Sequence, residues 1–140
     1  MRRRARDLMV LNGCLSNLSD IGLALAMYDP DGERLPPTKQ WMDNVSLYLS
    51  SPSILHCPGV AKESKDEFGY AMRRKYGGIL TTTIPDWANE PLIFDSNLTQ
   101  KNAATDEVEV PGFSRHPQQS VLFADGHSSI FRKTEVGSKR

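Results

Sequence analysis

The sequence predicts a single α+β domain in which a long N-terminal helix packs on a small antiparallel sheet with many loops between. Two patterns carry this prediction. Apolar residues recur at spacings of three and four from Leu8 to Tyr28, which is the period of one helical face. Late in the chain, two β-prone runs flank Asp125-Gly126, a pair typical of a tight hairpin turn. Because each element is apolar on one face, we expect the two faces to be buried against each other.

Size and charge limit what the chain can be. Its 140 residues suit one domain over residues 1–140, with room for a core but little for a second domain. Hydrophobic residues make up 39% and charged residues 24%, which is within the globular range. The 17 basic and 17 acidic side chains balance. We therefore expect no nucleic-acid partner, because a nucleic-acid binder needs a net basic face.

The long helix is expected over residues 4–28, which is roughly 37 Å at 1.5 Å per residue. It ends at Asp29-Pro30-Asp31-Gly32, where a proline without a backbone donor meets a turn-forming pair. The side chains expected to face the sheet are Leu11, Leu15, Leu18, Ile21 and Leu25.

Between the helix and the hairpin, the pattern is weaker. Residues 29–118 predict a short helix, loops and short strands, and residues 119–132 predict the C-terminal hairpin. Within the first range we expect a helix from Thr38 to about Ser50, a short strand at Ile54–His56, a strand within Phe68–Met72 and a buried strand at Pro91–Asp95.

A cluster of arginines stands at the start of the long helix. It could contact anionic lipid or nucleic acid, although charge runs are more often a solvated helix surface. No run reaches the roughly 18 apolar residues that a membrane span requires, and residues 1–30 lack the pattern of a secretory signal. The arginines are Arg2, Arg3, Arg4 and Arg6.

The two cysteines, Cys14 and Cys57, are too far apart in sequence for a CxxC site, and two thiols alone make a poor zinc site. Cys14 stands at the edge of the apolar helical stripe, and Cys57 precedes Pro58 in a loop that could reach it. The pair can form a disulfide or remain two buried thiols. We predict the disulfide, which would close a loop of about 44 residues.

His116, Asp125 and His127 are the residues that most suggest catalysis. They could bind a metal or act as an acid–base pair, as in a metal-dependent hydrolase. However, Asp125-Gly126 is also what a tight hairpin turn requires, and His127 then begins the next strand. The sequence contains no HExxH motif and no nucleophile elbow. We therefore expect a protein that is not an enzyme.

Calcium is the cofactor that the sequence leaves possible. It takes six to eight oxygen ligands, often from Asp side chains and loop carbonyls. Asp95 and Asp125, with Asp106, stand in or beside loops that could converge, although no EF-hand spacing occurs. No other cofactor is expected.

Several segments match, in the same order, those of one known family. The matching segments are Cys14-Leu-Ser-Asn17-Leu-Ser-Asp-Ile21-Gly22 with the residues up to Tyr28, then Leu35-Pro36-Pro37, His56-Cys57-Pro58, Gly69-Tyr70-Ala71-Met72, Pro91–Asp95, and His116 followed by Val121–His127. From about residue 5 to 132 the chain resembles bacterial pilin-like proteins with a prepilin-type N-terminus. The subfamily is the one named for a His followed about nine residues later by Asp-Gly. In this chain eight residues separate His116 from Asp125, and Pro117-Gln118-Gln119 replaces the usual Gly-Gly.

The resemblance implies a structural role. Family members carry an apolar half-helix before the Arg-rich stretch, which anchors them in the inner membrane and later packs in a filament core. It implies a periplasmic or extracellular domain, an oxidising compartment that favours Cys14–Cys57, and calcium binding as in related major pseudopilins. The expected partners are other pilin-like subunits and secretion-machinery proteins, with membrane contact only through that preceding segment.

The function expected is a subunit of a type II secretion pseudopilus or of a type IV pilus-like fibre. The first alternative is a secreted or surface binding module that keeps the pilin-like fold and does not polymerise. The second is the hydrolase described above.

Overall fold

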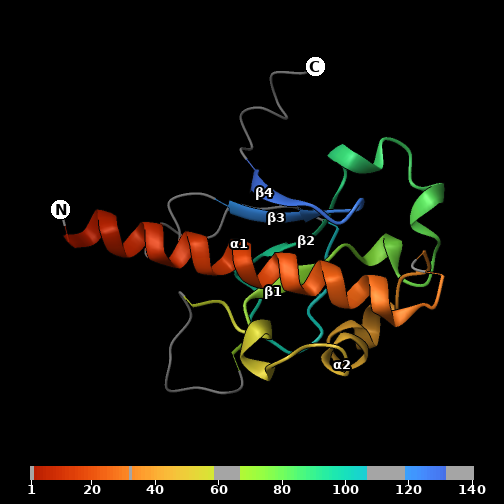
Figure 1. The fold of residues 1–140 in the computed structure, drawn as a ribbon, viewed down its shortest axis with the longest axis horizontal. Coiled ribbons are helices and arrows are strands. Elements are labelled where there is room, and N and C mark those ends of the chain that lie inside the picture. The colour runs from red at the N-terminus through yellow and green to blue at the C-terminus, as the bar shows by residue number, and fades with distance from the viewer. Residues whose placement is uncertain (1, 32, 59–66, 107–118, 132–140) are drawn as a thin grey trace.

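One helix and one sheet dominate the structure, a computed structural model that describes residues 2–31, 33–58, 67–106 and 119–131. Helix α1 comes first, and the four strands of the described residues form one antiparallel open sheet (Figure 1). The predicted α+β class is confirmed at this level. The elements are α1 (Arg2–Tyr28), η1 (Thr38–Gln40), α2 (Trp41–Ser46), η2 (Pro52–Leu55), β1 (Tyr70–Met72), η3 (Arg74–Tyr76), η4 (Thr81–Thr83), η5 (Trp87–Asn89), β2 (Pro91–Asp95), β3 (Gln119–Phe123) and β4 (Ser128–Phe131).

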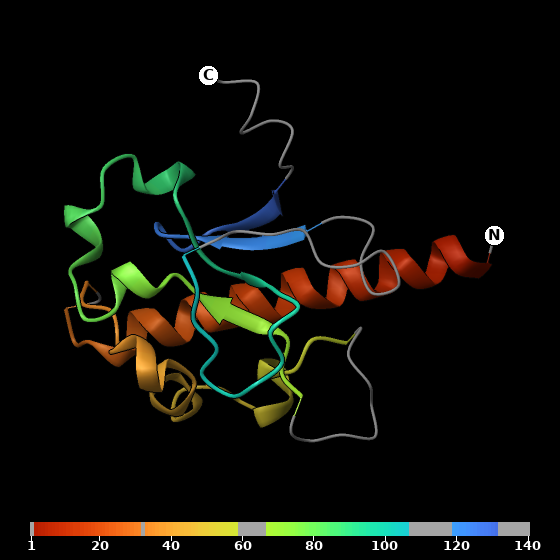
Figure 2. The same cartoon turned by 180° about the vertical axis from the view of Figure 1, so that it is seen from behind.

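The sheet order follows the chain order, β1-β2-β3-β4, and every neighbouring pair is antiparallel. Gly126 at φ 100° closes the β3–β4 hairpin, a conformation that glycine adopts without strain. At the other side of the sheet, the β1 residue Met72 forms a parallel bridge with Ala104. The segment after β2 therefore runs beside β1 (Figure 2).

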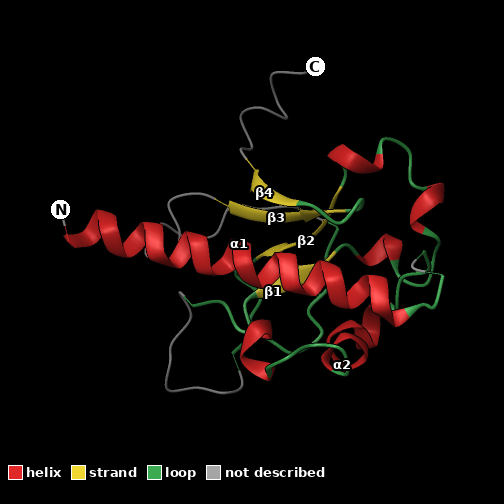
Figure 3. Cartoon of the chain, viewed as in Figure 1, coloured by secondary structure: helices red, strands yellow, loops and turns green. Residues whose placement is uncertain are grey.

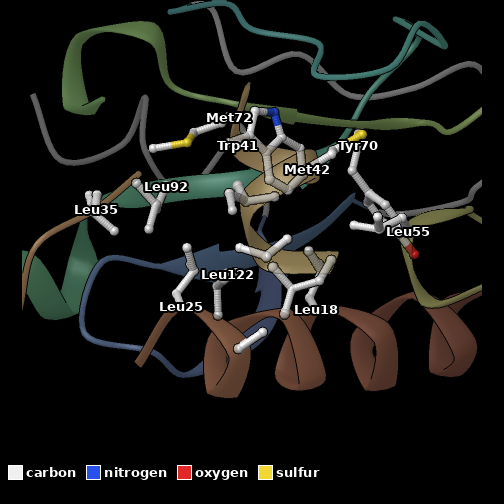
Figure 4. Close-up of a cluster of buried hydrophobic side chains, with 14 of the residues drawn as sticks. Leu18, Leu25, Leu35, Trp41, Met42, Leu55, Tyr70, Met72, Leu92 and Leu122 are labelled. Atoms are coloured by element: carbon white, nitrogen blue, oxygen red, sulfur yellow. The ribbon is translucent and has the colours of Figure 1, made fainter. Parts of the chain in front are cut away.

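Helix α1 packs mainly on β3 and also contacts β4, β2 and α2. Leu122 on β3 belongs to the cluster that includes Leu18, Ile21 and Leu25 of the helix (Figure 4). Its neighbours on β3, Val121 and Phe123, belong to a second, smaller cluster. Because side chains alternate along a strand, the two clusters lie on opposite faces of the sheet.

Trp41 completes the main core from α2. Its side chain is fully buried, and its indole Nε1 donates a hydrogen bond to the carbonyl of Ala103 at 2.9 Å. Asn102 adds a second link, because its Oδ1 accepts from the backbone N–H of Met42 at 2.7 Å. These bonds fix α2 against the segment that borders β1. Helix α2 lies on the same side of the molecule as the C-terminal end of α1 (Figure 3).

Three expectations need correction. Residues 54–56 are not a strand: Pro52 starts the short helix η2, and Ser51 Oγ accepts from the N–H of Ser53. The short helix near Thr38 ends at Ser46 rather than Ser50. Leu15 is only half-buried, because the buried face of α1 is centred slightly differently and takes in Cys14 and Ala24.

The expectation that no segment is apolar enough to span a membrane also needs correction. Residues Met9–Tyr28 form a helix that is long and apolar enough, by length and composition, to cross a membrane. The core helix of a water-soluble domain passes the same test, and the face carrying Leu18 and Ile21 is buried against the sheet.

Candidate functional site

The two cysteines meet in the core. Cys14 on α1 and Cys57 after η2 are both buried, and their sulfurs lie 3.1 Å apart as a hydrogen-bonded pair of thiols. The loop that carries Cys57 is held by the bond from its backbone N–H to the carbonyl of Phe68 at 2.7 Å. Helix, loop and strand region thus converge on one pair of sulfurs, which sequence spacing alone left open.

Polar groups surround this pair. Asn17 Nδ2 donates both to the carbonyl of His56 at 3.2 Å and to the Tyr70 hydroxyl at 3.0 Å. The His56 ring stacks on Phe68 with centroids 4.3 Å apart, and its Nδ1 lies 2.8 Å from the carbonyl of Glu67. Sequence reasoning missed Asn17 and Tyr70, because nothing in their spacing relates them to either cysteine.

The environment of Cys14 disfavours the thiolate form of its side chain. The hydrogen bond to the Cys57 thiol, followed by burial, raises the pKa of Cys14 far above that of an ordinary thiol. Burial, followed by the charges of the neighbouring cysteines, also raises the pKa of Tyr70 well above its usual value. A catalytic cysteine needs the opposite, a stabilised thiolate. The arrangement therefore suits a structural pair.

The β3–β4 turn holds Asp125 and His127 together. Asp125 Oδ1 accepts from the N–H of His127 at 3.1 Å and lies 2.5 Å from His127 Nδ1, and the His127 ring stacks on Phe123 with centroids 4.6 Å apart. Each contact is local to the turn, so the hairpin geometry accounts for Asp125 and Gly126. His116, the third member of the suggested group, lies outside the described residues.

The two predicted calcium ligands are not brought together. Asp95 is fully buried at the end of β2, where its Oδ2 accepts from the N–H of Ser120 at 2.9 Å. Asp125 lies beyond Phe123, which pairs with Pro91 at the other end of β2. Asp106 Oδ1 accepts from the N–H of Lys75. Across the described part of the chain, no three His, Cys, Asp or Glu side chains converge on one point.

A cleft lies at the C-terminal end of α1, between the helix, the β3–β4 turn and η5; we call it the terminal cleft. Its volume is about 180 Å³. Trp87 at its wall is 42% exposed, and Glu33, Arg34 and Asp125 add charged groups. Large apolar side chains form much of the remaining lining: Leu25, Leu35, Leu92, Leu122 and Phe123.

Sequence reasoning missed this cleft. Trp87 begins η5 after Asp86, which has a left-handed backbone at φ 51°. Glu33, Trp87 and Asp125 are distant in sequence, and only the fold brings them around one opening. No periodic pattern signals such a cleft.

Comparisons of the chain with protein-family models, curated proteins and solved structures found no match. The resemblance to pilin-like proteins therefore stays a prediction.

Proposed function

We propose that this chain is a structural subunit of a type II secretion pseudopilus or a type IV pilus-like fibre, and that α1 is its assembly element. The domain would face the periplasm or the exterior, anchored in the inner membrane by a preceding apolar segment. Its partners would be other pilin-like subunits and proteins of the secretion machinery.

The observation that carries this proposal is the second face of α1. Met9, Leu23 and Met27 are 73%, 67% and 59% exposed, although all three are apolar. Met9 and Met27 are separated by about five turns and so lie on the same side of the helix. The face opposite the buried one thus offers apolar side chains at two places, Met9 in the first half of the helix and Leu23 with Met27 near its end, with the exposed Ser16 between them, and these suit packing against neighbouring helices.

The test begins with the gene. An apolar segment of about 20 residues behind a prepilin cleavage site, directly before this chain, is the expected result. The natural full-length protein is then expressed with Leu23→Cys and treated in cells with a bifunctional maleimide. We expect cross-linked dimers, because Leu23 would lie at a helix–helix contact and each subunit offers one exposed thiol, which can join one neighbour.

Leu47→Cys provides a matched control. Leu47 is 78% exposed and apolar, but it follows α2 and does not lie on α1. Cross-linked dimers with Leu23→Cys and none with Leu47→Cys support assembly through α1. Monomer only, or equal amounts of dimer from both positions, would contradict the proposal.

A non-polymerising binding module remains the second candidate, favoured by the terminal cleft with its exposed Trp87. Such a module would give no cross-linked dimer from Leu23→Cys at any expression level. It would also tolerate changes on the exposed face of α1, such as Met27→Ala, without loss of function.

A further inference from the structure

The terminal cleft has the dimensions of a site for one side chain. Its volume of about 180 Å³ is below the roughly 300–1,000 Å³ of pockets that enclose cofactors or drug-sized ligands. Leucines of α1, β2 and β3 line its apolar part, and the rim is polar. An occupant with an aliphatic stem and a polar head matches this division.

The charges at the rim favour a cation. Glu33 and Asp125 are carboxylates, one oxygen of Asp125 being shared with His127, and Arg34 is the one cation among the lining residues that the structure describes. The Arg34 guanidinium is engaged, because its Nη1 donates to the carbonyl of Gly78 at 2.7 Å. Next to it, Asp29 Oδ2 accepts from the N–H of Arg34 at 2.8 Å, which lowers the pKa of that carboxyl and keeps it ionised.

Trp87 adds a surface for the same kind of group. A guanidinium within about 6 Å of an indole face is attracted by the ring, and its aliphatic stem can cover apolar surface. A carboxylate beside it provides charge-assisted hydrogen bonds. Indole, carboxylates and leucines around one small opening therefore suit an arginine side chain.

The chain has such arginines at its other end. Arg2, Arg3, Arg4 and Arg6 belong to the first turns of α1, whereas Gly22, Leu25 and Ala26 near the end of the same helix line the cleft. The helix has 27 residues and is about 40 Å long at 1.5 Å per residue. Its first turns extend beyond the strands in both views (Figures 1 and 2). A molecule cannot place these residues in its own cleft.

We infer that the terminal cleft binds the arginine-rich start of α1, residues 2–6, from a second copy of this chain. This inference rests on the proposed assembly function and names a contact for it. The two surfaces differ, so the contact is head-to-tail and can repeat from one molecule to the next. Attraction between two copies needs no net charge on the protein, because its positive and negative groups lie at opposite ends.

The contact is weak for isolated domains. Exposed ion pairs contribute little each, and salt at about 0.15 M screens them beyond roughly 8 Å. Anchoring neighbouring subunits in one membrane would raise their effective concentration, so a weak contact could still order them. We therefore expect self-association of the 140-residue chain to be detectable at low salt and to weaken as salt is added.

Two complementary variants test the inference by sedimentation velocity at low salt. The cleft variant carries Glu33→Gln and Asp125→Asn, the second of which retains an acceptor for the turn; neither change introduces a positive charge that could attract the tail variant. The tail variant carries Arg3→Glu and Arg4→Glu. Each variant alone should self-associate at least tenfold more weakly than the wild type. Their equimolar mixture should form a one-to-one complex that does not grow, because one intact tail meets one intact cleft.

Three results would overturn the inference. They are a wild-type chain that stays monomeric at low salt, variants that associate like the wild type, and a mixture that forms no complex. Circular dichroism of each variant checks that it is folded. Trp87 fluorescence should change on mixing and not in Trp87→Phe, since the other tryptophan, Trp41, is fully buried.

Two further measurements separate this contact from its alternatives. If the wild type sediments with phosphatidylglycerol vesicles but does not self-associate, the arginines serve lipid and the inference is wrong. If full-length Leu23→Cys gives cross-linked dimers in cells while the mixture of cleft and tail variants forms no complex, the fibre proposal stands and only this contact fails. If Leu23→Cys gives no cross-link in cells while the mixture forms the one-to-one complex, the fibre proposal is wrong and the contact stands.

Discussion

Replacing Leu18 by alanine should destabilise the domain far more than the same change at Leu23. Both residues lie on α1, and both changes replace leucine by alanine in a helix interior, so helix propensity changes equally. Leu18 is fully buried in the main core, whereas Leu23 is 67% exposed. The difference between the two variants therefore isolates the packing of α1 on the sheet.

The magnitude follows from burial. Removing a fully buried leucine side chain costs 2–5 kcal/mol, which combines the lost transfer free energy with the cavity left behind. Leu18 is enclosed between the helix and the sheet, and we expect about 3–4 kcal/mol. An exposed substitution usually stays within about 0.5 kcal/mol. The free energy of unfolding of a small domain is about 5–15 kcal/mol. A loss of this size should therefore lower the Tm of Leu18→Ala by roughly 10 °C.

Urea unfolding of the wild type and both variants, followed by far-UV circular dichroism, measures these differences. The slope of free energy against urea should be unchanged, so that the shift in midpoint reports stability. Equal losses for the two variants, or a larger loss for Leu23→Ala, would refute the packing of α1 described here. In an assay of fibre assembly the order of the two effects should reverse, with Leu23→Ala the more damaging change, because Leu23 would then lie at a contact between subunits.

Three further outcomes are expected. Oxidation should join Cys14 to Cys57 and raise the unfolding free energy by about 4 kcal/mol, as expected for a loop of about 44 residues; mass spectrometry that finds both thiols alkylated after oxidation of the folded protein would contradict this. Burial and the hydrogen bond to Glu90 raise the pKa of Tyr76 to about 12 from 10.0, so its stabilisation is complete below pH 10 and is lost as the pH rises to about 12. Between pH 9 and pH 12 the wild type should lose about 2 kcal/mol more than Tyr76→Phe in urea unfolding, since Tyr70, whose pKa is also raised, contributes to the loss in both proteins. Gly22→Ala should destabilise the domain by about 1 kcal/mol in the same urea assay, because a Cβ there would lie 3.0 Å from the Gly126 carbonyl oxygen. This crowding outweighs the gain in helix propensity. Increased stability of the variant would show that the hairpin moves aside.

The elements with strong local patterns were predictable. The three- and four-residue spacing of leucines indicates α1 whatever surrounds it, and Asp125-Gly126 specifies a turn through its own backbone preferences. The segment Pro91–Asp95 reads as a buried strand because its side chains are apolar on both faces. Weak patterns failed where a local cap competed, as at Ile54, which η2 includes after Pro52.

The candidate sites were predictable only in part. Cys14 could be placed at the margin of a helical stripe, but its partner sulfur at 3.1 Å depends on how the loop after η2 is held against Phe68. The hydrogen bonds of Asn17 to that loop and to Tyr70 have no signature in sequence, since the residues come from three separate segments.

The sequence by itself determined the secondary elements with short-range causes: the period of α1, the turn at Asp125-Gly126 and the apolar strand at Pro91–Asp95. It also determined the separation of the N-terminal arginines from the acidic residues 29–33. Only the tertiary structure decided which face of α1 is buried, how the sulfurs meet, and that Glu33, Trp87 and Asp125 surround one cleft. The physical reason is range: periodicity and turn preference act over a few residues, whereas a cleft or a thiol pair depends on packing between segments distant along the chain.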